Sequence, residues 1–223
     1  CKVGMKMQKK QLRKFIGYLY SRLEHVAGAV ELIDEVAELI EQEISDDEDQ
    51  RVASQKTGEF PLPKEVLEND SAFAVFSDGA CRGNPGPGAW GAMAQNSAGE
   101  VLFTASGVET LTTNNQMELE GAFQGLYQLI DTESFDRNNP VRLYSDSKYV
   151  VDGVQKWVSG WKKRGWKKAD GKAPENVEYW KKLTELNANF NDIEYIWVKG
   201  HSGHPQNEKC DQLANEALDD SGF

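Results

Sequence analysis

The stretch VFSDGACRGNPGPG, residues 75–88, constrains the fold of this chain more than any other. The apolar run at residues 72–76 predicts a buried strand that leads to the carboxylate Asp78, and the turn behind it is too rich in glycine and proline for a helix or a sheet. A carboxylate at the end of a central strand is held rigidly, and its glycine neighbours let a polyanion come close. This placement suits a metal ligand that faces phosphate, although an Asp-Gly pair after a strand is more often a plain turn.

Two further carboxylates occupy comparable places. Residues 141–146 predict a second strand, which ends on Asp146 and leads into a helix. Residues 117–130 have helical spacing behind good capping residues at 112–115, and Glu118 lies in the first turn. Taken alone, Glu118 is a surface side chain that complements the helix dipole. Further strands are expected at 89–95, 101–107 and 193–198, and further helices at 177–186 and from Gln206 onward, the last of which carries Asp211.

A dense basic segment interrupts an otherwise acidic chain. The formal net charge is -11, yet residues 157–168 read WVSGWKKRGWKK. Basic side chains interleaved with aromatic rings favour contact with a nucleic-acid backbone. A merely solvated helix face does not need three indoles, although some of them could belong to the core. The residues concerned are Trp157, Trp161, Lys162, Lys163, Arg164, Trp166, Lys167 and Lys168.

Composition narrows the class of protein. A hydrophobic content of 39% with 27% charged residues fits a soluble globular protein, and no apolar run is long enough to cross a membrane. The N-terminus lacks the pattern of a secretory signal, and the cysteines Cys1, Cys81 and Cys210 are too scattered for a disulfide framework. We therefore expect a cytoplasmic protein. His201, His204 and Cys210 lack the spacing of a zinc site.

The N-terminal region has a different pattern. From Leu12 to Ile44 apolar residues recur at alternating steps of four and three, which is a heptad seam. Two interpretations stay open: one long helix that self-associates, or two shorter helices with a bend near Gly28. Residues 46–70 are polar, acidic at their start and interrupted by prolines, and they predict a linker.

Five ordered motifs place the remainder in a known family. FSDGACRGNPGPGAWGA, TTNNQMELEGA, LYSDSKYV, WVSGWKKRGWKKADGKAPENVEYW and WVKGHSGHPQNEKCDQLANEA together resemble bacterial-type ribonuclease H over residues 71–220. The resemblance implies an α/β fold, with a five-stranded mixed sheet of three antiparallel and two parallel strands and helices on both sides. It divides the chain into a helical segment (1–45, a coiled coil or helical hairpin), an acidic linker (46–70) and a catalytic domain (71–223).

The resemblance also implies an activity, namely endonucleolytic hydrolysis of the RNA strand of RNA–DNA hybrids to 5′-phosphate and 3′-hydroxyl ends. Asp78, Glu118, Asp146 and Asp211 would bind two Mg²⁺ ions, with Mn²⁺ as a substitute, and His201 would assist proton transfer or product departure. Lys148 stands where some relatives carry Gln. The positions that match hybrid-contacting residues are Asn84, Thr113, Asn114, Asn115, Lys148 and Asn207, together with Trp161, Lys162, Lys163, Arg164, Trp166 and Lys167 in the basic segment.

Two rival interpretations remain. The first is another nuclease or an integrase on the same fold, which the histidine loop and the tryptophan-rich basic segment disfavour. The second is a hybrid-binding scaffold that acts through its N-terminal helix, which the presence of all four carboxylates disfavours. The resemblance does not extend to residues 1–70, and for residues 12–44 we expect self-association or the docking of a protein partner.

Overall fold

The computed structural model describes residues 19, 23, 26, 28–30, 32–38 and 59–223. The chain divides into two compact units, Cys1–Ser54 and Gln55–Phe223, which are treated separately below. None of the helices within the described residues is both long and apolar enough to span a bilayer.

The described part of the first unit contains a bend between helical residues. Leu19 and Leu23 are helical, the amide of Val26 donates to the Leu23 carbonyl at 2.9 Å, and Gly28 has a φ of +78°. This left-handed conformation interrupts a helix and costs glycine little. Helical residues resume at 29–30 and 32–38. The described residues therefore favour two shorter helices over one continuous helix, and the rest of the predicted seam lies outside them.

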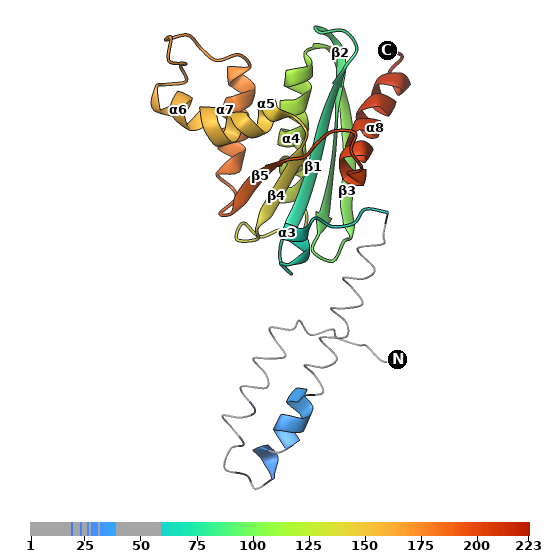
Figure 1. The fold of residues 1–223 in the computed structure, drawn as a ribbon, viewed down its shortest axis with the longest axis vertical. Helices are drawn as coiled ribbons and strands as arrows, with labels where there is room; N and C mark the ends of the chain where they lie inside the picture. Colours follow the sequence, from blue (N-terminus) through green and yellow to red (C-terminus); the bar gives the residue numbers. More distant parts are fainter. Residues whose placement is uncertain (1–18, 20–22, 24–25, 27, 31, 39–58) are drawn as a thin grey trace. The chain divides into compact units, whose positions relative to one another are not determined.

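The second unit is built on a five-stranded mixed sheet in the order β3-β2-β1-β4-β5 (Figure 1). Neighbouring strands β1, β2 and β3 are antiparallel, whereas β4 is parallel to both β1 and β5. The predicted α/β class and strand directions are therefore confirmed. The strands are β1 (Phe73–Cys81), β2 (Gly86–Asn96), β3 (Val101–Thr112), β4 (Val141–Ser145) and β5 (Ile193–Trp197).

Helices cover both faces of this sheet, as Figure 1 shows. On one face, Val75 of β1 packs with Leu119 and Leu126 of α4 in the main core. Because strand side chains alternate, the next residue, Phe76, points to the other face, where it packs with Cys210 of α8. The described helices are α3 (Lys64–Leu67), α4 (Asn114–Ile130), α5 (Lys148–Asp152), the π-helical turn η1 (Gly153–Trp157), α6 (Val158–Lys163), α7 (Val177–Asn187) and α8 (Pro205–Asp220).

Residues 60–67, here named the strap, pack against the domain instead of forming part of a linker. Leu62 and Val66 of the strap are buried in the core of the second face with Phe76, Met93 and Tyr144. The linker interpretation is therefore revised for this segment, and residues 46–58 lie outside the described residues. The polar composition around the strap concealed these two apolar residues, because a single helical turn is too short to produce a periodic signal.

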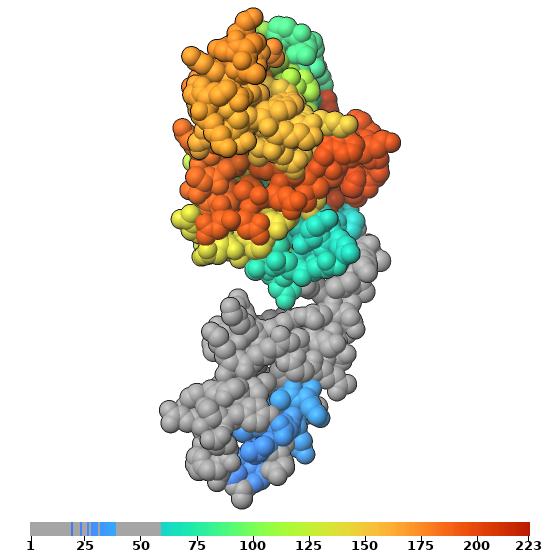
Figure 2. All heavy atoms as spheres, turned by 60° about the vertical axis from the view of Figure 1, so that its left-hand side comes forward, coloured from blue at the N-terminus to red at the C-terminus, as the bar shows by residue number. Residues whose placement is uncertain are grey.

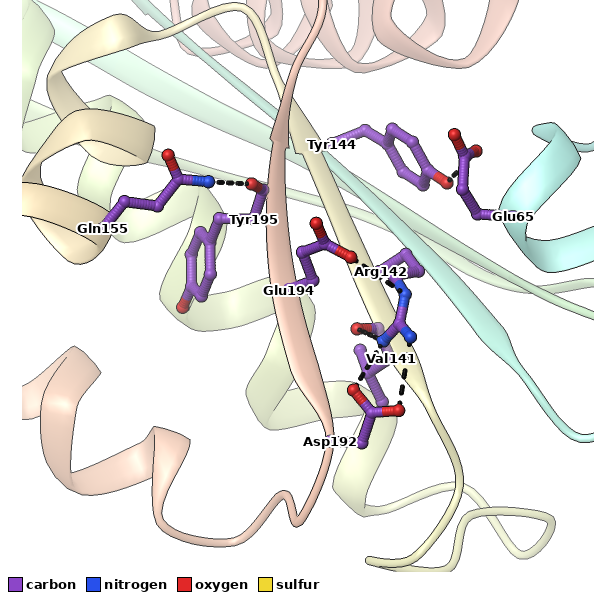
Figure 3. Close-up of polar contacts among 8 residues, drawn as sticks. All are labelled: Glu65, Val141, Arg142, Tyr144, Gln155, Asp192, Glu194 and Tyr195. Carbon is purple, nitrogen blue, oxygen red and sulfur yellow. Dashed lines mark hydrogen bonds and ion pairs between the residues drawn. The ribbon is translucent and has the colours of Figure 1, made fainter.

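Ion pairs join β4 and β5 at the end of the sheet opposite the predicted catalytic residues (Figure 3). Arg142 on β4 pairs with Asp192 at 2.9 Å and with Glu194 on β5 at 3.4 Å. The hydrogen bond and charge of Asp192 raise the pKa of this guanidinium. Both acids are about half exposed, so this contact adds little stability, but it fixes the register of β5 beside β4.

Candidate active site

Three carboxylates from three different elements converge at one end of the central strands. Asp78 lies on β1, Glu118 in the first turns of α4, and Asp146 directly after β4. One oxygen of each lies within 4.8 Å of the others, the only group of metal-ligand spacing found in the part of the chain that the structure describes. The parallel pairing of β1 with β4 explains the meeting of the two aspartates, because parallel strands end at the same edge.

Glycine lets the helix bring the third carboxylate close. A Cβ added at Gly79 would overlap the backbone of Met117 and Glu118, so any larger residue would displace α4 from β1. The start of α4 is fixed by a capping box, in which Thr113 accepts from the Gln116 amide and the Gln116 side chain accepts from the Thr113 amide. Strand and helix are therefore locked together at the point where Asp78 and Glu118 meet.

Burial and neighbouring charges favour the neutral forms of Asp78 and Glu118. Burial and the neighbouring Asp146 charge raise the pKa of Asp78 to about 8, with a smaller contribution from Asp211. Burial, followed by the charges of Asp78 and Asp146, raises the pKa of Glu118 well above its usual range. Like charges in a low-dielectric site repel, so the arrangement is unfavourable when all the groups are ionised.

This donor set fits a divalent cation. The Oε2 atom of Glu118 is buried and has no hydrogen-bond partner among the described residues, while its Oε1 accepts a weak bond from Asn114 at 3.4 Å. A cation would satisfy that buried oxygen and offset the repulsion among the three carboxylates. The donors are all carboxylate oxygens, which hard cations such as Mg²⁺ prefer.

Asp211, the fourth predicted ligand, lies beside this group and not within it. It is on α8, and its Oδ1 accepts a hydrogen bond from the Asn215 amide nitrogen at 2.8 Å. Its charge nevertheless raises the pKa of Asp78, so the two are electrostatic neighbours. Asn215 was not anticipated from the sequence, although its position four residues after Asp211 on a helix was a usable signal.

The predicted catalytic histidine lies on an exposed loop beside Asp146. His201 has a φ of +49°, within the segment that joins β5 to α8. A Cβ added at the preceding Gly200 would overlap the Asp146 carboxylate, so the loop backbone runs directly against this acid. Trp197, another residue that sequence reasoning missed, donates from Nε1 to the Asp146 carbonyl at 2.9 Å.

Several predicted substrate-contacting residues surround the acids. Asn84 accepts from the Asn114 amide at 3.3 Å, which joins the β1–β2 loop to the start of α4. Asn115 is exposed in the same turn. The Nζ atom of the exposed Lys148 lies 4.8 Å from the centroid of the Trp197 ring. Asn207 on α8 is buried, and its Oδ1 has no partner among the described residues.

The basic segment, residues 157–168, separates its aromatic from its charged side chains. Trp161 and Trp166 are partly buried against the main core, and Trp161 packs edge-on against Trp180 with ring centroids 5.8 Å apart. These indoles support the segment from within. Figure 2 shows this segment in orange at the upper end of the unit. The basic side chains are exposed, namely Lys162, Lys163, Arg164 and Lys167.

Comparison with known proteins places this geometry in a family. The RNase H family model matches residues 70–219, two thirds of the chain. This chain belongs to the RNase H family. It is 49% identical over 145 residues to a ribonuclease H of Erythrobacter litoralis, covering 65% of this chain and 94% of that protein. It is 47% identical over 144 residues to ribonuclease HI of Caulobacter vibrioides, covering 65% and 91%.

Solved structures of the RNase H family agree with the fold. The crystal structure of RNase H1 from Halobacterium salinarum matches with a TM-score of 0.53 and 29% identity, over 67% of this chain and 98% of that one. Residues 1–69 lie outside the match to the family model. The strap, residues 60–67, is thus outside the family match although it packs within the same unit.

Proposed function

We propose that this chain is an endoribonuclease that hydrolyses the RNA strand of RNA–DNA hybrids, leaving 5′-phosphate and 3′-hydroxyl ends. The observation that carries the proposal is the convergence of Asp78, Glu118 and Asp146 within 4.8 Å in a domain of the RNase H family. A purely structural role is disfavoured, because three clustered carboxylates without cations repel one another and cost stability. A nuclease that depends on divalent cations makes use of that arrangement.

Each group has a distinct part in the reaction. Asp78, Glu118 and Asp146 would hold divalent cations, with Asp211 contributing from α8. When bound, such cations would supply charge stabilisation at the scissile phosphate and a lowered pKa for the attacking water. His201, on its exposed loop, moves a proton or assists product departure, because an imidazole can both accept and donate a proton.

We infer that two Mg²⁺ ions occupy the site, with Mn²⁺ as a substitute. The support is chemical: the donors are carboxylate oxygens, and Mg²⁺ retains water and takes its remaining ligands from substrate phosphate. Isothermal titration of the hybrid-free protein with Mg²⁺, Mn²⁺ and Zn²⁺ tests this inference. A site that binds Zn²⁺ in a tetrahedral geometry and does not support cleavage with Mg²⁺ would contradict it.

Selectivity for the hybrid rests on its two unlike strands. The residues around the acids face the RNA strand, whose 2′-hydroxyls are displayed in a wide minor groove. The exposed lysine and arginine side chains of the basic segment contact the phosphates of the DNA strand. The proposed substrate contacts are Asn84, Thr113, Asn114, Asn115, Lys148 and Asn207, with Trp161, Lys162, Lys163, Arg164, Trp166 and Lys167 in the basic segment.

The deciding experiment incubates end-labelled RNA–DNA, RNA–RNA and DNA–DNA duplexes of one sequence with the full chain, in Mg²⁺ or in EDTA. We expect cleavage of the RNA strand of the hybrid alone, in Mg²⁺ alone. Cleavage of the DNA duplex would favour another nuclease on this fold. Binding of the hybrid without cleavage in any divalent cation would favour a scaffold.

Two further proposals concern the setting of the enzyme. Cys81 and Cys210 are both free thiols, which supports a reducing, cytoplasmic location. For residues 12–44 we propose self-association or docking of a protein partner, because the heptad seam offers an apolar stripe that needs a partner surface.

A further inference from the structure

The strap, residues 60–67, packs against residues that closely precede the predicted catalytic acids in the sequence. Its buried side chains share one core with Phe76, Tyr144 and Cys210. Phe76 is two residues before Asp78, Tyr144 two before Asp146, and Cys210 one before Asp211. In Figure 2 the teal strap lies on the same face as the red-orange atoms that lead from β5 to α8. A segment outside the family match thus supports elements that carry three of the four acids.

A buried pair of glutamines joins the strap backbone to the start of α8. Gln206, only 3% exposed, donates from Nε2 to the Pro61 carbonyl at 2.6 Å and to Gln95 Oε1 at 3.1 Å. Gln95 in turn donates to the Phe60 carbonyl at 3.1 Å. Two strap carbonyls therefore accept from two buried amides. The Gln95 amide also donates to the Gly99 carbonyl at 3.1 Å.

The strap holds both ends of the histidine loop, residues 199–204. Val198, directly before the loop, packs in the core with Leu62 and Val66. Gln206, two residues after the loop, is the hydrogen-bonded glutamine. The loop itself is exposed, and its hydrogen bonds join Ser202 to Lys199 and the Gly203 amide to Glu208 at the start of α8. His201 has a positive φ, a conformation that persists in a non-glycine residue where the surrounding structure holds it.

A third contact fixes the strap to the strand that carries Asp146. The Tyr144 hydroxyl donates to Glu65 at 3.2 Å (Figure 3). The Tyr144 ring also stacks on Phe76 with centroids 5.0 Å apart. This contact sets the strap against β4 independently of Gln206. The strap thus bridges the end of β4 and the start of α8.

We propose that the strap is a positioning element for the histidine loop and that Gln206 is its principal positioning residue. The inference rests on the proposed function and deepens it. The Gln206 amide holds the first turn of α8 against Pro61, and this contact sets the path of the loop, in which Gly200 lies against the Asp146 carboxylate and His201 follows directly. The strap thereby acts mainly on turnover, because none of its own residues is among the proposed hybrid contacts.

The test compares Gln206→Met with Gln212→Met in the full chain. Both replace a glutamine of α8 by a side chain of similar length without a donor. Gln212, however, is exposed, and its side chain bonds the exposed Glu216 and Lys209 side chains of the same helix. We expect Gln206→Met to lower kcat about tenfold with an unchanged KM for the hybrid. Gln212→Met should match the parent chain. Assays are run below the unfolding temperature of every variant, which is established by circular dichroism.

A second variant approaches the same loop from the strap. Leu62→Ala loosens the apolar contact with Val198 and leaves α8 untouched, and Lys64→Ala, at an exposed position of the strap, is its control. Amide hydrogen exchange is measured without substrate. Both Gln206→Met and Leu62→Ala should raise exchange across residues 199–206, whereas the two controls should not. Unchanged exchange in this segment in both test variants would overturn the proposal.

A double-mutant comparison separates loop positioning from general stability. If Gln206 acts through His201, then Gln206→Met should cost almost nothing in kcat when added to His201→Ala. A full tenfold loss in that background would overturn the proposal. Should the parent chain fail to cleave the hybrid, the proposed function fails, and the exchange measurement still decides whether the strap positions the loop.

Discussion

At the scale of single residues, the candidate active site contains acids whose ionisation is made unfavourable by the fold. Asp78 and Glu118 both have raised pKa values, and burial is the main cause for each. The strand ends pointed to Asp78 and Asp146, whereas Glu118 and Asp211 were assigned as ligands only through the family resemblance. The sequence could not reveal that Asp211 is held aside by Asn215, because that depends on how α8 is rotated against the sheet.

Replacement of Asp146 by Asn should abolish cleavage and preserve hybrid binding. The change removes a charge from the carboxylate group while the exposed basic side chains stay in place. We expect turnover to fall at least about 100-fold, with the Kd for the hybrid changed little. Gel-shift and cleavage assays measure the two quantities, and Asp152→Asn, which loses only an exposed pair with Lys156, is the control. Near-normal turnover would refute the role of Asp146.

The metal-free protein should lose stability as the pH rises from about 4 to about 8. The folded state holds the Asp78 proton up to a pKa of about 8, whereas the unfolded chain releases it near the ordinary value of 3.8. In that window the folded state binds more protons, so its free energy of unfolding falls with rising pH. Melting curves in EDTA measure the slope, which should be flatter in Asp78→Asn and in the parent chain with Mg²⁺. Equal slopes in all three would contradict the raised pKa.

At the scale of elements, the contact between β1 and α4 and the basic segment, residues 157–168, serve different proposed purposes. The approach of α4 to β1 across Gly79 brings Glu118 to Asp78, and residues 157–168 carry exposed basic side chains. The sequence predicted both elements from hydrophobic periodicity and from the interleaving of Trp with Lys. The sequence did not show that the tryptophan rings pack against the core while the lysine and arginine side chains are exposed. That difference depends on how the π-helical turn before α6 orients the segment.

Gly79→Ala should separate the helix from the strand. The added methyl group would meet the backbone of Glu118, which cannot move aside as a flexible side chain would. We expect a loss of about 1–3 kcal/mol in the free energy of unfolding, together with weaker Mg²⁺ binding. Gly160→Ala is the control, because its methyl group would meet only the mobile end of Arg164. Urea unfolding and calorimetric titration provide the two measurements, and an unchanged Mg²⁺ affinity would count against this view of the site.

Neutralising the basic segment should weaken substrate binding and leave the chemical step intact. Lys162→Gln with Lys163→Gln removes two exposed charges. The KM for the hybrid should rise, and its dependence on salt should become shallower by about one to two ions released. The kcat at saturating hybrid should stay near that of the parent. Steady-state kinetics at several salt concentrations test this, and a fall in kcat alone would point to a structural role for the segment.

At the scale of the whole molecule, the chain has two compact units, and the buried face of the first agrees with its apolar pattern. Ile33 is 6% exposed in the described part of the first unit, whereas its neighbour Leu32 is 62% exposed. This difference agrees with the heptad seam, which includes Ile33 and omits Leu32. The periodicity of the sequence therefore predicted which face is buried, but it left the bend at Gly28 open, because a repeat of apolar residues does not report a single backbone torsion.

Ile33→Lys should destabilise the first unit without loss of cleavage per active site, because Ile33 is buried within the single chain. A buried charge costs far more than one placed at the exposed Leu32, so Leu32→Lys is the matched control. Circular dichroism measures the helix content, and the cleavage assay measures activity. Equal helix content in both variants and the parent chain would contradict the burial of Ile33.

The strap also changes where this enzyme should be divided for engineering. The family match starts at residue 70, and a boundary drawn there records which residues relatives share. The boundary that matters to a folding chain is instead set by burial, and Leu62 and Val66 lie in the core. A chain cut at the homology boundary would expose the apolar surface that Leu62 and Val66 cover, and it would remove the Phe60 and Pro61 carbonyls that accept from Gln95 and Gln206. A chain cut before Gln55 keeps the compact unit whole.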